Sequence, residues 1–220
     1  MRKATRIMVS TFGTLVGLIG VEHGIGAVLQ GSVAPSGMMF PSWPESAFFQ
    51  ILNGEPALTV LPNLLFTGIL AILFSMVYLV WAIRFVHRKN GSLIMILLSI
   101  GMLLFGGGIF PPVFGILLGA AATRIHAPLT WWSERLSTEW AHFLGLLWPW
   151  FFGAAIASWL SMFPGVPVLN YFFGVNSTNL ILILLFCMFG FLMLGLIAGT
   201  ARDLQGQAYS TAGRLIHRKA

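Results

Sequence analysis

The sequence predicts an all-α fold: a polytopic, integral membrane bundle of about six transmembrane helices, with the N and C termini both cytoplasmic. Three observations carry this prediction. Hydrophobic residues make up 57% of the 220 residues and charged residues only 8%, about a third of the roughly 25% that is usual in soluble domains. The apolar residues gather in long runs, and the basic residues cluster between these runs. The composition therefore excludes an ordinary soluble globule.

Six apolar runs mark the expected helices, since roughly 20 residues of helix cross the hydrocarbon core of a bilayer. We expect the whole chain, residues 1–220, to form a single transmembrane domain, with an outer loop at 30–57 and a cytoplasmic tail at 202–220. Within the outer loop, Ser46–Leu52 predicts a short re-entrant or interfacial helix that ends at Asn53. The six runs cover residues 7–29, 58–83, 92–108, 112–124, 138–162 and 178–201.

The third and fourth runs form one apolar stretch that is broken in its middle. Three glycines and two prolines lie between residues 106 and 112, and such a segment cannot continue a straight helix. The stretch is therefore either a tight hairpin of two short helices or one long helix with a kink.

The positions of Lys and Arg favour the hairpin. The connections at 30–57, 109–111 and 163–177 contain neither residue, so two crossings by the broken stretch place all twelve basic residues on one side. The positive-inside rule makes that side cytoplasmic. A re-entrant hairpin, which enters and leaves on the cytoplasmic side, satisfies the charges equally well. For the location we expect a multi-pass protein of the plasma (inner) membrane.

The first run carries a face of small residues suited to close helix packing. At 100° per residue, four glycines of this run cluster within roughly 60° of one another. Small residues at four-residue spacing let two helix backbones approach closely in a membrane. A similar pair lies in the last run. The predicted helix-packing residues are Gly13, Gly17, Gly20, Gly24, Gly195 and Gly199.

Two ionisable residues lie deep inside a predicted span, and such groups are the first candidates for function because lipid makes them costly. Glu22 and His23 fall in the outer half of the first run. Glu22 points roughly 170° away from the centre of the glycine face. It must therefore meet a second helix, a polar cavity or the folded outer loop.

The outer loop adds further polar groups to this region. Asn53, Glu55 and Asn63 can join Glu22 and His23 in an outward-facing acidic pocket, which has no basic partner on its side of the membrane. Such a pocket suits a cation, a proton or an amine-bearing substrate. The alternative is that Glu22 accepts hydrogen bonds from the loop and pins it, while Glu55 caps a helix.

We expect no metal and no cofactor, and we assign no catalytic residue. Glu139 and His142 lie one helical turn apart, but a di-iron site needs two such pairs and further carboxylates. His23 and His142 differ in depth by roughly 20 Å, so one haem iron cannot take both.

The sequence allows three classes of function. A transport or permease-type component comes first, because broken helices and outer acids together can form a substrate path. An accessory or assembly subunit of a larger membrane complex comes second, since the glycine faces can bind another membrane protein. A membrane-embedded enzyme acting on a lipid or quinone comes third, so we lean against catalysis. The expected partners are the lipid bilayer and either another membrane protein or a second copy of the chain, and we expect no nucleic acid.

Overall fold

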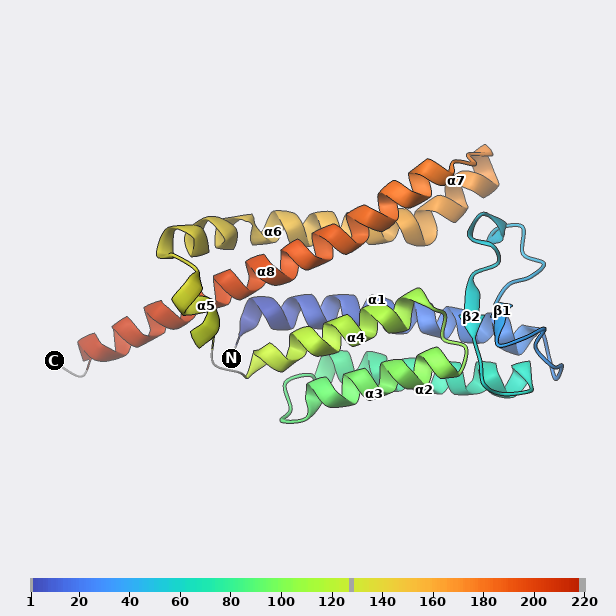
Figure 1. Cartoon of the computed structure of the whole chain (residues 1–220), viewed down its shortest axis with the longest axis horizontal. Helices are drawn as coiled ribbons and strands as arrows, with labels where there is room; N and C mark the ends of the chain where they lie inside the picture. Colours follow the sequence, from blue (N-terminus) through green and yellow to red (C-terminus); the bar gives the residue numbers. More distant parts are fainter. Residues whose placement is uncertain (1, 127–128, 218–220) are drawn as a thin grey trace.

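A computed structural model shows an elongated bundle of helices with almost no sheet (Figure 1), and 75% of its residues are helical. It describes residues 2–126 and 129–217, and for residues 207–217 it describes the backbone only. The all-α prediction is confirmed at this level. Four helical segments are long and apolar enough to cross a membrane: Lys3–Leu29, Leu64–Arg84, Thr138–Phe173 and Thr178–Gly206.

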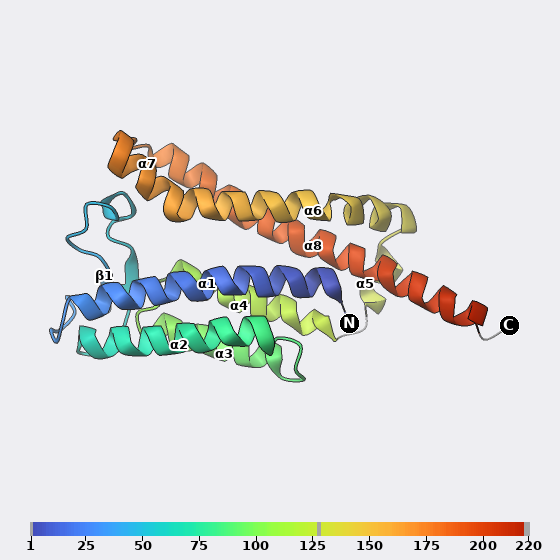
Figure 2. The same cartoon turned by 180° about the vertical axis from the view of Figure 1, so that it is seen from behind.

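The first four helices form one layer of the molecule, in which α1 lies along α2 in both views (Figures 1 and 2). A Cβ atom added to Gly17 would come within 2.7 Å of Leu79 Cβ, and one added to Gly24 would come within 2.9 Å of the Gly68 carbonyl oxygen. The small residues therefore set the distance between these two helices. The bounds are α1 Lys3–Leu29, α2 Leu64–Arg84, α3 Gly91–Leu104 and α4 Phe110–Ala122, which a 3-10 turn, η2, continues over Thr123–Ile125.

The broken apolar stretch folds as a hairpin of two helices, α3 and α4, and not as one kinked helix. Gly106 and Gly108 both have a φ of 85°, a left-handed conformation that only glycine adopts without strain. Pro111 then falls in the first turn of α4, where a missing N–H costs nothing. At 1.5 Å per residue, α3 and α4 are each about 20 Å long, which is shorter than the roughly 30 Å hydrocarbon core.

The remaining helices form a second group beside the first, in which α6 runs roughly along the direction of α1 and α8 crosses it obliquely (Figure 1). Two features here differ from the sequence prediction. The connection expected at 163–177 contains a further helix, and the last helix continues through the expected tail to His217. The bounds are α5 Thr130–Arg135, α6 Thr138–Leu160, a π-helical break η3 Ser161–Gly165, α7 Val166–Phe173 and α8 Thr178–His217.

The expected outer loop is more ordered than the sequence indicates. Its two short strands, β1 Met39–Pro41 and β2 Pro56–Leu58, pair antiparallel with Phe40 opposite Ala57. The expected helix over 46–52 is largely wrong: only η1, a 3-10 turn over Gln50–Leu52, is helical. It does end at Asn53, which takes the left-handed conformation. Before η1 the segment forms turns instead, in which the Ser46 N–H donates to the Trp43 carbonyl at 3.4 Å and the Phe49 N–H to the Ser46 carbonyl at 3.1 Å.

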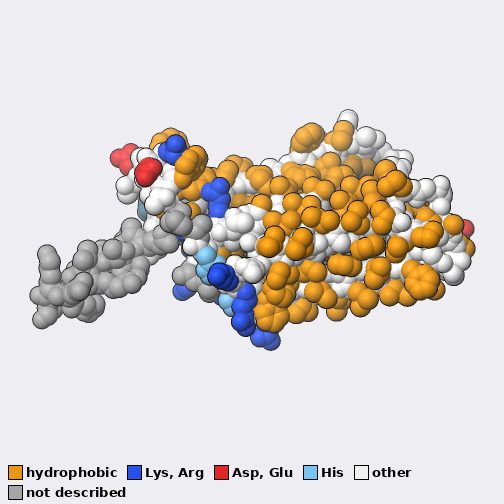
Figure 3. All heavy atoms as spheres, turned by 60° about the horizontal axis from the view of Figure 1, so that its bottom comes forward, with side chains coloured by type: hydrophobic (Ala, Val, Ile, Leu, Met, Phe, Trp, Pro, Cys, Tyr) orange, Lys and Arg blue, Asp and Glu red, His pale blue; other side chains and the backbone are white. Residues whose placement is uncertain are grey.

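The two ends of the bundle differ in charge. Lys and Arg side chains gather at one end, while hydrophobic side chains cover the long face (Figure 3). We call the end that holds the N-terminus the basic end, and the opposite end, which holds β1, β2 and α7, the loop end. At the basic end Asp203 of α8 accepts hydrogen bonds from the backbone N–H groups of Ala4 and Thr5, both at 2.9 Å. This cap joins the two groups of helices.

Candidate functional site

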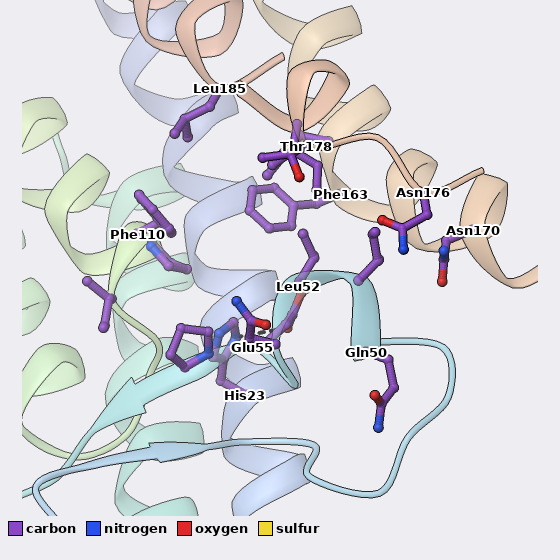
Figure 4. Close-up of a pocket in the computed structure, with 17 residues that line it drawn as sticks. His23, Gln50, Leu52, Glu55, Phe110, Phe163, Asn170, Asn176, Thr178 and Leu185 are labelled. Atoms are coloured by element: carbon purple, nitrogen blue, oxygen red, sulfur yellow. Dashed lines mark ion pairs between the residues drawn. The ribbon is translucent and has the colours of Figure 1, made fainter. Parts of the chain in front are cut away.

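The candidate site lies at the loop end, where α1 passes beneath the outer loop (Figure 4). Glu22 and His23 are consecutive residues of α1, which continues without a break to Leu29. Because the glycine face of α1 is turned towards α2, Glu22 is turned away from that contact and faces the loop.

Glu22 is held by an aromatic side chain of the loop. The indole Nε1–H of Trp43 donates a hydrogen bond to Glu22 Oε1. Trp43 itself stacks on Phe49, with ring centroids 5.3 Å apart, and its backbone N–H donates to the Gly54 carbonyl at 2.9 Å. One carboxylate oxygen of Glu22 therefore fastens the loop to α1, and the other oxygen is left for a second partner.

Glu55 reaches the site through an unusual backbone. Asn53, Gly54 and Glu55 all have positive φ values, of 53°, 66° and 55°. A residue with a Cβ in this conformation costs about 1–2 kcal/mol. Two backbone hydrogen bonds, from Glu55 N–H to the Leu52 carbonyl and from Ser42 N–H to the Glu55 carbonyl, hold it there at 3.0 Å each. The result is a carboxylate side chain turned inward, with only 4% of the residue exposed.

His23 is the centre of the cluster. Its Nδ1 atom lies 3.0 Å from Glu22 Oε2, 3.6 Å from Glu55 Oε2 and 3.0 Å from the Ile19 carbonyl oxygen. Figure 4 shows His23 and Glu55 side by side. Within the described part of the chain, this trio is the group of His, Cys, Asp or Glu side chains close enough to share a metal ion, with ligand atoms within 4.8 Å of one another.

Burial dominates the electrostatics of Glu55. Removal from water and, to a smaller extent, the neighbouring Glu22 carboxyl raise the pKa of the Glu55 carboxyl to about 8, against the attraction of His23. Glu55 therefore holds a proton at neutral pH when no other cation is present. Two carboxyl groups beside one imidazole can exchange a proton or accept a cation in its place.

A cavity of about 570 Å³ opens beside this cluster, and His23 and Glu55 form part of its wall. The wall is built by both groups of helices, from α1, η1 and the start of α4 on one side and from η3, α7 and α8 on the other. The lining contains no Lys or Arg; its polar members besides the cluster are Gln50, Asn53, Asn170, Asn176 and Thr178. The cavity thus combines an apolar wall with a few polar groups, as small-molecule sites do.

The structure brings together four of the five residues predicted to bind. Glu22, His23 and Glu55 are in contact, and Asn53 lines the cavity. Asn63 does not join them. Its side chain caps α2 by accepting a hydrogen bond from the Phe66 N–H, and it donates to Ser32 Oγ at 2.8 Å. A cap at the start of a helix fixes the asparagine there and keeps it out of the cavity.

Sequence reasoning missed two parts of the site. Trp43 shows no signal of its role, because nothing local relates an indole in the loop to Glu22 in α1. The wall from α7 and α8 was also missed, although Asn170 and Asn176 are polar residues in the connection expected at 163–177. Gly108 had a signal as part of the glycine run, and a Cβ at this position would lie 2.7 Å from His23 Nε2.

No protein-family model, curated protein or solved structure matches this chain. Its function is therefore argued from the geometry of its own residues.

Proposed function

We propose that the chain is a small transporter or permease-type component of the plasma (inner) membrane, which accepts a cation in an outward-facing acidic pocket. In this proposal the six apolar runs expected from the sequence all cross the membrane, the short helices α3 and α4 together with the turns that flank them, so that both termini and the basic end are cytoplasmic. The clustering of Lys and Arg at that end supports this orientation.

The observation that carries the proposal is the cavity between the two groups of helices, with the buried His23 and Glu55 in its wall. Transporters place their sites between helix groups, where broken helices line a path. Both helix breaks of this chain line the cavity: Ile109 and Pro111 come from the α3–α4 hairpin, and Phe163 from η3. Irregular backbone at membrane depth is tolerated where it borders such a cavity.

The contacts at the basic end support an outward-open arrangement. There Asp203 of α8 caps α1 by accepting hydrogen bonds from the Ala4 and Thr5 N–H groups. The two groups of helices are thus joined at the basic end, while at the loop end the cavity lies between them and the outer loop contacts α7 through Phe48 and Tyr171, whose ring centroids are 5.9 Å apart. Alternating access between the two sides needs one such closed end and one open end.

The proposal is tested by charge movement in proteoliposomes. The purified chain is reconstituted and exposed to jumps in the concentration of H⁺, Na⁺, K⁺, a divalent cation or methylammonium, while transient currents are recorded on a solid-supported membrane. We expect a current with one of these cations, and we expect Glu55→Gln and Glu22→Gln to abolish it. Glu45→Gln is the matched control, because Glu45 is an exposed acid on the same loop, and it should keep the current.

Two outcomes would overturn the proposal. One is the absence of current with every cation while the chain keeps its thermal unfolding transition. The other is a current that Glu55→Gln and Glu45→Gln change equally. A discrete complex with a second membrane protein in native mass spectrometry, together with silent proteoliposomes, would favour the accessory-subunit alternative.

A further inference from the structure

We propose that Glu22, His23 and Glu55 bind one divalent transition-metal ion, held by a single imidazole nitrogen and two carboxylate oxygens. This inference rests on the proposed function for the fate of the ion, since the metal would be the cation that the cavity accepts. Binding itself is measured at equilibrium and needs no transport. From the sequence we expected these residues to form a pocket for a cation, a proton or an amine, and we expected no metal.

The distances between the donor atoms fit a small metal ion. Metal–nitrogen and metal–oxygen bonds of about 2.0–2.2 Å place two ligands of a tetrahedral ion about 3.3–3.6 Å apart. His23 Nδ1 lies 3.0 Å from Glu22 Oε2 and 3.6 Å from Glu55 Oε2. The Glu22 and Glu55 ligand oxygens lie within 4.8 Å of each other, so modest side-chain shifts complete the first three positions.

The cavity wall beside the cluster, as far as the structure describes it, supplies no Lys or Arg. Glu55 is 4% exposed, and its Oε2 atom accepts no hydrogen bond from the residues that the structure describes. His23 Nδ1 faces three acceptor oxygens, those of Glu22 and Glu55 and the Ile19 carbonyl, while Trp43 Nε1–H donates to the other oxygen of Glu22. When Glu55 is ionised, one ring proton cannot satisfy all three. A buried acceptor without a donor is costly, and a bound cation removes that cost.

The supporting residues hold the ligands in place. Trp43 donates to the far oxygen of Glu22, which orients the near oxygen towards His23. Gly108 leaves room for the imidazole ring, because any Cβ there would lie 2.7 Å from Nε2. Outer partners of this kind fix metal ligands in known sites, and their loss usually lowers metal affinity about 10- to 100-fold.

The types of ligand atom limit which metal ions the site can bind. One imidazole with two carboxylates suits Zn²⁺ and its first-row neighbours, whereas Mg²⁺ and Ca²⁺ prefer oxygen ligands alone. The cavity beside His23 and Glu55 leaves a position open for water or another ligand, and it supplies an entry path from the loop end.

The test is calorimetric titration of the full chain in detergent, after removal of any purification tag and of metal by a chelator. We expect one equivalent of ZnCl₂ to bind with a dissociation constant of about 10⁻⁶ M or tighter, and MgCl₂ not to compete. His23→Gln and Glu55→Gln should each weaken binding at least tenfold, on the order of the loss of one ligand. His142→Gln is the matched control, because it removes an imidazole that also has a glutamate one turn away, and it should leave the affinity unchanged.

A second measurement keeps the test independent of folding defects. The zinc X-ray absorption spectrum of the native chain should show one imidazole and otherwise oxygen ligands. A spectrum with two or more imidazoles, a folded native chain that binds no zinc, or equal affinity in Glu55→Gln and the control would each overturn the inference. Zinc binding without a current in proteoliposomes would contradict transport alone, and a current with another cation without zinc binding would contradict the metal site alone.

Discussion

Asp203 provides the sharpest test of how the two groups of helices are joined. Its two carboxylate oxygens accept the N–H groups of Ala4 and Thr5 at 2.9 Å each, and the residue is 8% exposed. These N–H groups belong to the first turn of α1 and have no partner within the helix. Asp203 also attracts the neighbouring, largely buried Arg2 guanidinium. Removal of the carboxylate takes away the hydrogen-bond acceptor of the Ala4 and Thr5 N–H groups and a negative charge beside Arg2.

The loss of folding free energy in Asp203→Ala follows from the hydrogen bonds that the substitution removes. Bonds to a charged group contribute about 1.5–3 kcal/mol each, and the loss of a helix cap costs about 0.5–2 kcal/mol. Because these contributions overlap, we expect Asp203→Ala to lower the free energy of unfolding by about 3 kcal/mol. Asp203→Asn keeps one acceptor oxygen but no charge, so its cost should be about half as large.

Unfolding by SDS in mixed micelles, followed by circular dichroism, measures these changes. Glu139→Ala is the control, because Glu139 is an exposed acid in the first turn of α6, and it should leave the transition almost unmoved. A loss below about 1 kcal/mol for Asp203→Ala would refute the reasoning, since two hydrogen bonds to a buried carboxylate should contribute more than that.

Three further predictions concern the helix contact and the site. Gly17→Ala should cost about 1–3 kcal/mol in the same assay, because its Cβ would lie 2.7 Å from Leu79 Cβ; Gly153→Ala, which meets open space, should cost nothing. Gly108→Ala and Gly31→Ala share a positive φ, but only the first would displace His23. Both should lose about 1–2 kcal/mol from backbone strain, and only Gly108→Ala should also weaken zinc binding; equal binding in the two would contradict the role of Gly108. In metal-free protein the folded state holds the Glu55 proton more tightly than the unfolded chain does, so the free energy of unfolding should fall as pH rises from 4.5 to about 8, by up to roughly 4–5 kcal/mol. Thermal unfolding at pH 5 and pH 8 measures this change, and Glu55→Gln should flatten the pH dependence. A native chain whose stability rises with pH would contradict the raised pKa of Glu55.

Most of the helical architecture follows from the sequence, because local composition determines which segments enter a membrane. Long apolar runs predict α1, α2, α6 and the first part of α8, and the glycine and proline run predicts the break between α3 and α4. Some helices begin a few residues away from the predicted position because a capping residue sets their first turn. Asn63 caps α2, so α2 begins later than the hydrophobic run does. Helix α7 was missed because Pro164 and Pro167 indicate a loop, although a proline in the first turn also starts a helix.

The sequence predicted a smaller part of the site than of the helices. The sequence by itself predicted that Glu22 and His23 lie in a long apolar helix, with Glu22 on the side away from the glycine face, because helical periodicity fixes that angle. Only the tertiary structure decided that Trp43 and Glu55 meet them. Their approach depends on the pairing of β1 with β2 and on the left-handed turn at Asn53–Glu55.

The cavity, too, belongs to the tertiary structure, since its two walls come from helix groups far apart in the chain. The physical reason is that periodicity and hydrophobicity act within one helix, whereas the approach of two helices depends on side-chain packing between them. The sequence thus determined which groups are costly to place in a membrane, and the tertiary structure decided which partners they meet there.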